Sequence, residues 1–418
     1  MFVPETPVRV RWHAPVFCFI FFTVTLFAQR GEPVETLVDR VSDPVEPYIV
    51  DIDLRELPPP VQWQPGDSIK EVPRRKTSFP QEVKEPRPSV DPLLELQERA
   101  AMPENTRAFD APILNFDGQG FSGVNPPDTV GDIGIDYYIQ SINAGGGATY
   151  VIYNKSDGSV AAGPLDMDVL GTGICSGGLG DPIILYDEPA GRWMISEFSG
   201  NGNALCVYIS QTGDPISGGW FSYTFTTPSF PDYPHYGVWN DAYYVGTNEG
   251  GRIIYAMDRT QMLAGAAATM QRFVVPDLAG FGFNALTPAD LDGSDMAPPG
   301  SPGIIMGHRD DEVHNGGSAD PTQDWLDIYE LTIDFDTPGN SSLVGPTSVG
   351  IGEFDSHLCG LTSFSCFPMP GSGTTLDPLR EVIMHRLTYR NFGSHQTLVG
   401  NHVTDVDGTD RGGLRWWE

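Results

Sequence analysis

Three aspartates that stand beside prolines are the residues whose types and spacing point most directly to chemistry. Asp128, Asp181 and Asp232 recur at similar intervals, each next to a proline. Carboxylates brought together in this way bind a cation or a hydroxyl-rich ligand, or serve as acid and base in glycoside hydrolysis. The alternative is turn chemistry, in which each aspartate accepts hydrogen bonds from backbone N–H groups.

A second candidate is the aromatic and proline-rich stretch from residue 230 to residue 239. Its rings would offer a stacking surface for sugars beside Asp232. The same residue types also fill the interior of β-structure, so burial in the core is the competing interpretation. We therefore predict a ligand-binding set that consists of Asp128, Asp181, Asp232, Tyr233, His235 and Trp239.

An acidic loop supplies the metal-site hypothesis. Asp290, Asp292 and Asp295 follow the pattern D-x-D-G-x-D, in which alternating carboxylates surround a hard cation and Gly293 permits a sharp turn. The expected cofactor is Ca²⁺, although the loop lacks the bidentate glutamate that completes an EF-hand. A polar turn without a metal is the alternative, and residues 405–410 carry the same ambiguity.

Motifs for other chemistries are absent from the sequence. Neither H-E-x-x-H nor G-x-S-x-G occurs, which removes the commonest signatures of zinc peptidases and serine hydrolases. The net charge of −31 argues against nucleic acid and anionic membranes as partners, because phosphate groups are bound by clustered Lys and Arg. No catalytic residue is assigned, and whether the chain is an enzyme stays open.

The N-terminal residues indicate export. Residues 1–28 read as a signal peptide, because Arg9 and Arg11 precede an apolar run and Ala28 offers a small residue for cleavage. A buried strand or an uncleaved anchor is the alternative. No comparable apolar stretch follows, so no membrane span is expected after it. The expected location is secreted or extracellular, at the cell surface or in the periplasm.

The cysteines fit the same compartment. Four remain beyond Cys18, and an even number in an oxidising compartment suggests two disulfides. Short separations favour Cys175 with Cys206, and Cys359 with Cys366, over the other two connectivities.

The elements that must position the candidate residues divide the chain near residue 108. Residues 29–107 are rich in Pro and charge and poor in aromatics, so we expect a mostly disordered acidic linker or a pro-segment. Residues 108–418 consist of short runs rich in Gly, Asp and aromatics, which predicts an all-β domain. Three runs fit buried strands, at residues 137–142, 193–198 and 242–247.

An internal repeat narrows the fold. Pairs of Pro and Asp open successive segments at residues 127–128, 181–182, 231–232, 288–290 and 377–378. Their spacing is near that of one propeller blade, about 40 to 50 residues, with loop insertions. We therefore predict a β-propeller, with a β-sandwich as the structural alternative.

The same domain resembles a known family. Stretches that begin at Pro126, Gly180, Ser210, Phe230 and Tyr389 are similar to an uncharacterised family of large secreted proteins, mostly bacterial, with a predicted β-propeller body. The resemblance covers about residues 110–418. The resemblance implies a β-propeller fold, and it implies no particular activity. Because members of that family continue past the equivalent of Glu418, we expect this chain to be a truncated form with an incomplete ring.

Two functions follow from these observations. The first is a secreted, non-catalytic propeller that binds an extracellular polysaccharide or protein, with Ca²⁺ in its loops. The second is a polysaccharide-active enzyme, a hydrolase or lyase with carboxylates at the channel mouth. Two of Asp128, Asp181, Asp232 and Glu197 about 5 to 9.5 Å apart in an open pocket would favour hydrolysis. If all four bond backbone turns, the enzyme hypothesis fails.

Overall fold

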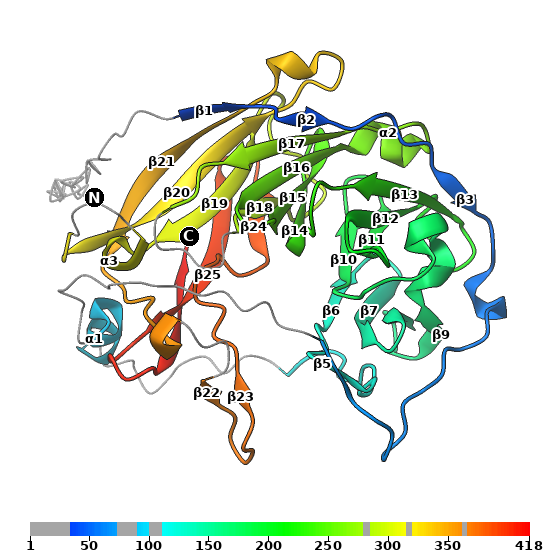
Figure 1. Ribbon diagram of the computed structural model, residues 1–418, viewed down its shortest axis with the longest axis horizontal. Coiled ribbons are helices and arrows are strands. Elements are labelled where there is room, and N and C mark those ends of the chain that lie inside the picture. Colours follow the sequence, from blue (N-terminus) through cyan, green and yellow to red (C-terminus); the bar gives the residue numbers. More distant parts are fainter. Residues whose placement is uncertain (1–33, 73–89, 100–110, 279–284, 315–319, 362–365) are drawn as a thin grey trace, which may run out of the picture.

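The computed structural model describes residues 34–72, 90–99, 111–278, 285–314, 320–361 and 366–418 (Figure 1). Antiparallel strands dominate these residues, which confirms the predicted all-β class. The helices are short: α1 (Pro92–Arg99), α2 (Arg259–Ala264) and α3 (Asp311–His314). The proposed signal peptide lies outside the described residues.

Four meanders, each of four consecutive antiparallel strands, form the body of the fold. The first contains β6 (Val130–Ile133), β7 (Tyr137–Ala144), β8 (Gly147–Asn154) and β9 (Val160–Asp166). The second contains β10 (Ile183–Asp187), β11 (Arg192–Phe198), β12 (Ala204–Ser210) and β13 (Trp220–Thr226). The third contains β14 (Asp232–Val238), β15 (Ala242–Asn248), β16 (Arg252–Asp258) and β17 (Met270–Val275). The fourth contains β18 (Thr287–Leu291), β19 (Gly303–Arg309), β20 (Gln323–Thr332) and β21 (Ser342–Gly352).

The first strands of successive meanders pack against one another. β6 contacts β10, β10 contacts β14, and β14 contacts β18, so that the four sheets follow an arc around these strands (Figure 1). Every residue of β10 and β18 is buried, because neighbouring sheets cover both faces. This explains the continuous apolar runs of the sequence, because a strand that is covered on both faces does not alternate between apolar and polar residues. The three predicted strands are confirmed as β7, β11 and β15.

The last part of the chain joins the fourth sheet. β24 (Leu387–Asn391) pairs with β18 in parallel, and β25 (Gln396–Asp405) and β26 (Gly412–Trp417) continue the sheet from there. The two-stranded pair β22 (Phe367–Pro368) and β23 (Thr375–Leu376) precedes β24. The Asp-Pro pair at residues 377–378 therefore precedes a three-stranded extension of the fourth sheet.

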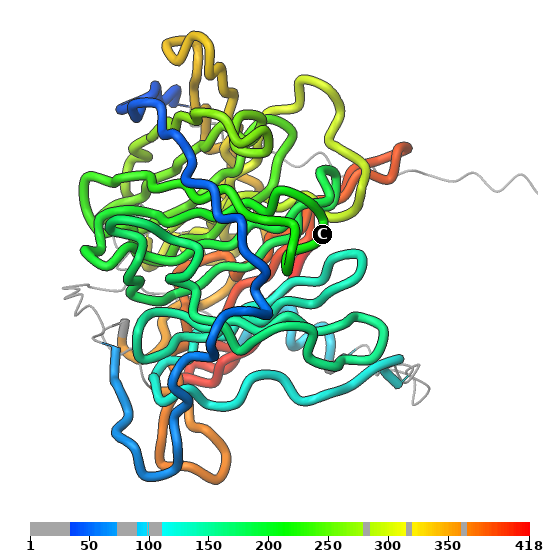
Figure 2. The backbone as a smooth tube through the Cα atoms, turned by 90° about the vertical axis from the view of Figure 1, so that its right-hand side faces the viewer, coloured from blue at the N-terminus to red at the C-terminus, as the bar shows by residue number. Residues whose placement is uncertain are grey.

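The segment before the meanders runs along their outer edges. β1 (Val34–Leu37) pairs with β21, β2 (Arg40–Val41) with β17, and β3 (Tyr48–Val50) with β13, all antiparallel. The short 3₁₀ helix η1 (Leu54–Glu56) then packs against β9. Figure 1 shows this blue segment along the rim of the sheets, and Figure 2 views it from the side.

This arrangement differs from the mostly disordered linker expected for residues 29–107. The side chains of Val34, Leu37, Tyr48 and Ile49 are exposed, so these strands pair largely through backbone hydrogen bonds, whereas Val50 and Leu54 are buried in the core of the first two meanders. Amino-acid composition indicates how much apolar area a segment can bury, but it does not indicate backbone pairing with a sheet edge. An unpaired sheet edge accepts any extended segment, and here the preceding chain occupies it.

Both predicted disulfides are confirmed. Cys175 is bonded to Cys206 at an S–S distance of 1.98 Å, and Cys359 is bonded to Cys366. The first joins the 3₁₀ helix η3 (Gly173–Cys175) to β12. The second closes a short loop after the fourth meander. The remaining short elements are β4 (Lys70–Glu71), β5 (Val124–Asn125) and the 3₁₀ helices η2 (Met167–Leu170), η4 (Pro338–Asn340) and η5 (Cys359–Leu361).

A buried ion pair links the second and third meanders. Arg259, at the start of α2, donates two hydrogen bonds to Asp187, at the end of β10, over 2.6 and 2.7 Å. The hydroxyl of Tyr243 in β15 donates a third bond to the same carboxylate over 2.8 Å. The Asp187 side chain has no exposed surface. Removing one partner of such a pair leaves a charge buried without compensation.

Replacing Arg259 by leucine should lower the free energy of unfolding by about 3 to 5 kcal/mol, because the Asp187 carboxylate then loses its cation. Urea denaturation followed by tryptophan fluorescence measures this change. The matched control is Glu95→Gln, which breaks the exposed pair of Glu95 and Arg99 in α1 and should cost less than about 0.5 kcal/mol. Equal effects of the two substitutions would contradict a link between the meanders through Asp187.

Candidate functional site

The three proline-linked aspartates lie at the entrances of three neighbouring first strands. One residue separates Asp128 from the start of β6, and one separates Asp181 from the start of β10. Asp232 is the first residue of β14. Because β6, β10 and β14 pack in sequence, the three entrances lie side by side. All three aspartates are half-buried, which leaves part of each accessible to solvent.

Asn143 in β7 holds two of these aspartates together. Its amide nitrogen donates to Asp128 Oδ2 over 2.7 Å and to Asp181 Oδ1 over 3.4 Å. Its amide oxygen accepts the Asp181 backbone N–H over 2.7 Å. The Asn143 side chain is itself buried, and its backbone N–H donates to the carbonyl of Pro127. One strand residue thus fixes both loops that carry the carboxylates.

The backbone at this site takes an unusual conformation. Asp128 has φ of 41° and Asp181 has φ of 52°, and Tyr233 beside Asp232 has φ of 56°. A left-handed conformation is uncommon for residues other than glycine and costs about 1 to 3 kcal/mol, with Asp among the residues that tolerate it best. Conformations of this kind cluster at binding and active sites.

The two carboxyl groups of Asp128 and Asp181 are close enough to share a proton. Burial, and then the charge of Asp128, raises the pKa of Asp181 to about 7. The amide of Asn143 opposes this shift, and the charge of Asp232 adds to it. The pair therefore carries fewer charges at neutral pH than two exposed aspartates would, and it releases its second proton near pH 7.

Tyr233 and His235 lie beside this pair. Burial raises the pKa of Tyr233, and the charges of Asp377 and Asp128 raise it further. The rings of Tyr233 and His235 meet edge-on with centroids 4.1 Å apart, and His235 stacks on His385 at 4.8 Å. Burial, followed by His385, lowers the pKa of His235 well below its usual value, so that its imidazole is neutral at physiological pH.

Five of the six predicted ligand-binding residues are thus neighbours, and the sixth is elsewhere. Trp239 has no exposed surface and belongs to the core between the third and fourth meanders. Its indole N–H donates to the carbonyl of Ser301 over 3.3 Å, and its ring contacts Tyr389 at 4.7 Å. The prediction of Trp239 as part of a stacking surface is wrong for this reason, and the competing core interpretation holds for it.

In the predicted metal loop, arginine side chains form ion pairs with two of the three aspartates. Asp290 in β18 accepts from Arg386 over 2.8 Å, and Asp292 accepts from Arg386 over 3.0 Å and from Arg390 over 3.3 Å. Asp295 is exposed and stands apart from this ion-pair cluster. The prediction of a cation site formed by Asp290, Asp292 and Asp295 is therefore wrong, because guanidinium groups already supply the positive charge.

Burial still dominates the electrostatics of Asp290. Burial raises the pKa of Asp290 to about 7, although the positive charge of Arg386 acts to lower that pKa. Arg386 also lies 3.5 Å from Asp132 of β6, so it joins the first meander to the fourth. The ambiguous turn at residues 405–410 resolves as turn chemistry: Asp405 accepts the backbone N–H groups of Asp407, Gly408 and Asp410.

The Asp128–Asp181 pair differs from the carboxyl arrangement of glycosidases. Retaining and inverting glycosidases separate their carboxyl groups by about 5 to 9.5 Å, whereas Asp128 and Asp181 are in direct contact. A groove of about 1010 Å³ lies between residues 58–70 and the first meander, and its lining includes none of the three aspartates or Glu197. Glu197 is buried beside Asp168 and Asp166. The discriminating geometry for hydrolysis is absent from that groove.

The sequence reasoning missed Asn143, the residue on which the site depends. An asparagine near the end of a strand whose last residues are buried was the available signal, because a buried amide must find partners. It also missed a second acidic cluster, formed by Asp310, Glu312 and Asp324, whose residues carry no recognisable motif.

Comparisons with known proteins add no relatives: no family model, no curated protein and no solved structure matches this chain. The family resemblance therefore stays a prediction. Within the described part of the chain, none of the helices has the length and apolar character needed to cross a membrane.

Replacing Asp181 by asparagine should raise the midpoint of thermal unfolding more at pH 8 than at pH 5. The folded-state pKa of Asp181, about 7, lies above its unfolded value. Its stabilising contribution is therefore complete only below the unfolded pKa of about 4, and it is lost progressively as the pH rises from there through 7; asparagine removes that loss. Asparagine also tolerates the left-handed backbone.

Thermal unfolding at pH 5 to 8 measures the effect, with Asp295→Asn as the exposed control. The difference between the two variants should grow from pH 5 to about pH 7 and then level off. Parallel curves for wild type, Asp181→Asn and Asp295→Asn over the whole range would contradict the shared site.

Proposed function

We propose that this chain is an extracellular β-propeller that binds a hydroxyl-rich polymer, without catalysis, at the entrances of its first strands. The observation that carries the proposal is the contact between Asp128 and Asp181 on one buried asparagine, in left-handed backbone conformations. Strained, partly exposed carboxylates that meet on one buried amide are typical of ligand-binding sites.

Two features support the propeller and the compartment. Consecutive four-stranded meanders that pack through their first strands are the blade arrangement of a propeller. Two disulfides are typical of an oxidising compartment, since cytosolic thiols are kept reduced. The apolar run before residue 28 agrees with export.

The chemistry of the site favours sugar hydroxyls. Carboxylates accept hydrogen bonds from hydroxyl groups, and the half-buried Tyr233 ring offers an apolar face. A pair that carries close to one negative charge binds neutral ligands at a lower desolvation cost than two free carboxylates would. The net charge of −31 also disfavours polyanionic polymers.

Substituting Asp128 or Asp181 by asparagine should weaken binding to neutral polysaccharides at least tenfold, because each removes an acceptor from the shared site. A glycan array followed by calorimetry on the strongest ligand measures this. Asp295→Asn is the control and should bind like wild type.

Three outcomes of the same experiment would contradict the proposal. They are the absence of any glycan ligand, unchanged binding by both variants, and release of reducing ends from the bound polymer, which would make the protein an enzyme. Binding that survives EDTA excludes a metal from the ligand contact.

A further inference from the structure

A second acidic cluster lies far along the chain from the site described above. Asp310 follows β19, Glu312 belongs to α3, and Asp324 belongs to β20. One carboxylate oxygen from each of the three lies within 4.8 Å of the others. Glu353, which directly follows β21, has its carboxyl group beside that of Glu312. Four carboxylates from four different elements therefore meet.

Two of these carboxylates are buried without a donor. Glu312 is 2% exposed and Glu353 is 5% exposed, and among the described residues no donor forms a hydrogen bond to any of their four oxygens. Asp310 and Asp324 are different, because backbone N–H groups hold them in place. Asp310 accepts from Val313 and Ser356, and Asp324 accepts from Asp311 and Phe354. Two oriented aspartates thus face two unsatisfied glutamates.

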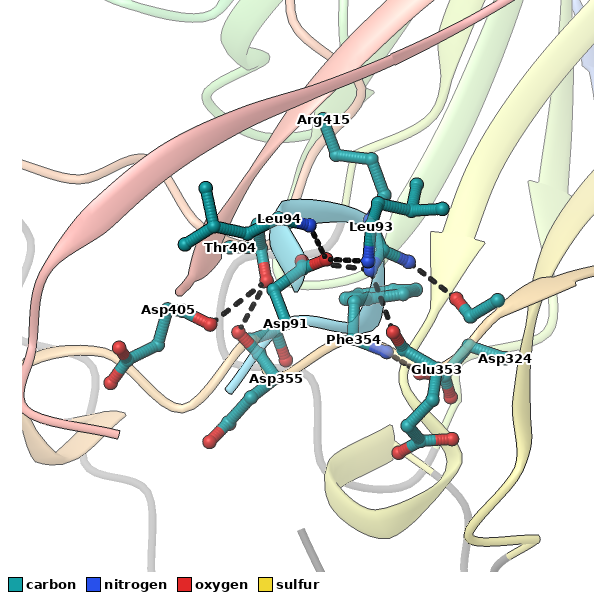
Figure 3. Close-up of polar contacts among 12 residues, drawn as sticks. Asp91, Leu93, Leu94, Asp324, Glu353, Phe354, Asp355, Thr404, Asp405 and Arg415 are labelled. Atoms are coloured by element: carbon teal, nitrogen blue, oxygen red, sulfur yellow. Dashed lines mark hydrogen bonds and ion pairs between the residues drawn. The ribbon is translucent and has the colours of Figure 1, made fainter. Parts of the chain in front are cut away.

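Nearby positive charges are engaged elsewhere. In Figure 3 the guanidinium of Arg415 bonds Asp91 over 2.7 Å and the main-chain carbonyl of Glu353, while the Glu353 side chain leads away from it. Arg309 pairs with Asp327 over 2.9 Å. Among the described residues, no ion pair involves any of the four clustered carboxylates.

This arrangement is electrostatically incomplete. Burial raises the pKa of Glu312 to about 8, of Asp324 to about 9 and of Glu353 to about 10, and the charges of the other cluster members push in the same direction. A buried carboxylate requires a partner of opposite charge, a proton or a metal ion. The spacing of the oxygens favours a metal ion, because one carboxylate oxygen each of Asp310, Glu312 and Asp324 lies within 4.8 Å of the others.

We propose that Asp310, Glu312, Asp324 and Glu353 form a buried Ca²⁺ site that ties α3 to the adjoining ends of β19, β20 and β21. Ca²⁺ binds oxygen ligands at about 2.3 to 2.6 Å, so two ligands on opposite sides of the ion lie about 4.8 Å apart. The limit of 4.8 Å among the three oxygens fits that spacing. An all-oxygen set selects a hard cation over zinc or copper.

The test uses the full chain, freed of divalent ions with EDTA and then titrated with Ca²⁺ in a calorimeter. We expect one ion bound per chain and a higher midpoint of thermal unfolding when Ca²⁺ is present. Glu312→Gln and Glu353→Gln keep the side-chain shape and remove a charged ligand, so each should lower the Ca²⁺ affinity at least tenfold and abolish the thermal shift.

The matched control is Asp407→Asn in the acidic turn at residues 405–410, which should bind Ca²⁺ like wild type. Circular dichroism in EDTA should show both glutamine variants folded, because each replaces a buried carboxyl group by a neutral amide of similar shape. No Ca²⁺ binding by the wild type, or undiminished affinity in both glutamine variants, would overturn the proposal.

Discussion

Packing of each meander against the next through its first strand is the constraint on which the rest of the structure depends. Strands such as β10 and β18 are buried at every residue, so their positions along the strand direction are fixed by the cores on both sides. The loops that enter these strands must then lie side by side. Polar residues in those loops meet because apolar residues in the strands pack.

The sequence predicts those features that repeat or that follow from hydrophobic pattern. The spacing of the Pro-Asp pairs locates the entrances of β6, β10 and β14, and Asp128, Asp181 and Asp232 therefore converge as expected. Features that depend on partners distant in the chain were not predictable. Arg386 neutralises Asp290 across nearly a hundred residues, and Glu353 reaches Glu312 from the end of another strand. Neither partner has a local motif.

The outer edges of the meanders show a different limit of sequence reasoning. Residues 34–50 pair with β21, β17 and β13 through their backbones, and much of their apolar side-chain surface stays exposed. Backbone pairing carries no side-chain signature, so a Pro-rich, charged segment and an edge strand look alike. Figure 1 shows residues 34–50 along the outer edges of the sheets.

The convergence of Asp128 and Asp181 is the central claim, and a double-mutant cycle tests it most directly. Free energies of unfolding at pH 8 are measured for the wild type, Asp128→Asn, Asp181→Asn and the double variant. If the carboxylates share one site, each single substitution relieves the same repulsion, and the double variant gains less than the sum by at least about 1 kcal/mol. Additivity within about 0.5 kcal/mol would contradict the account.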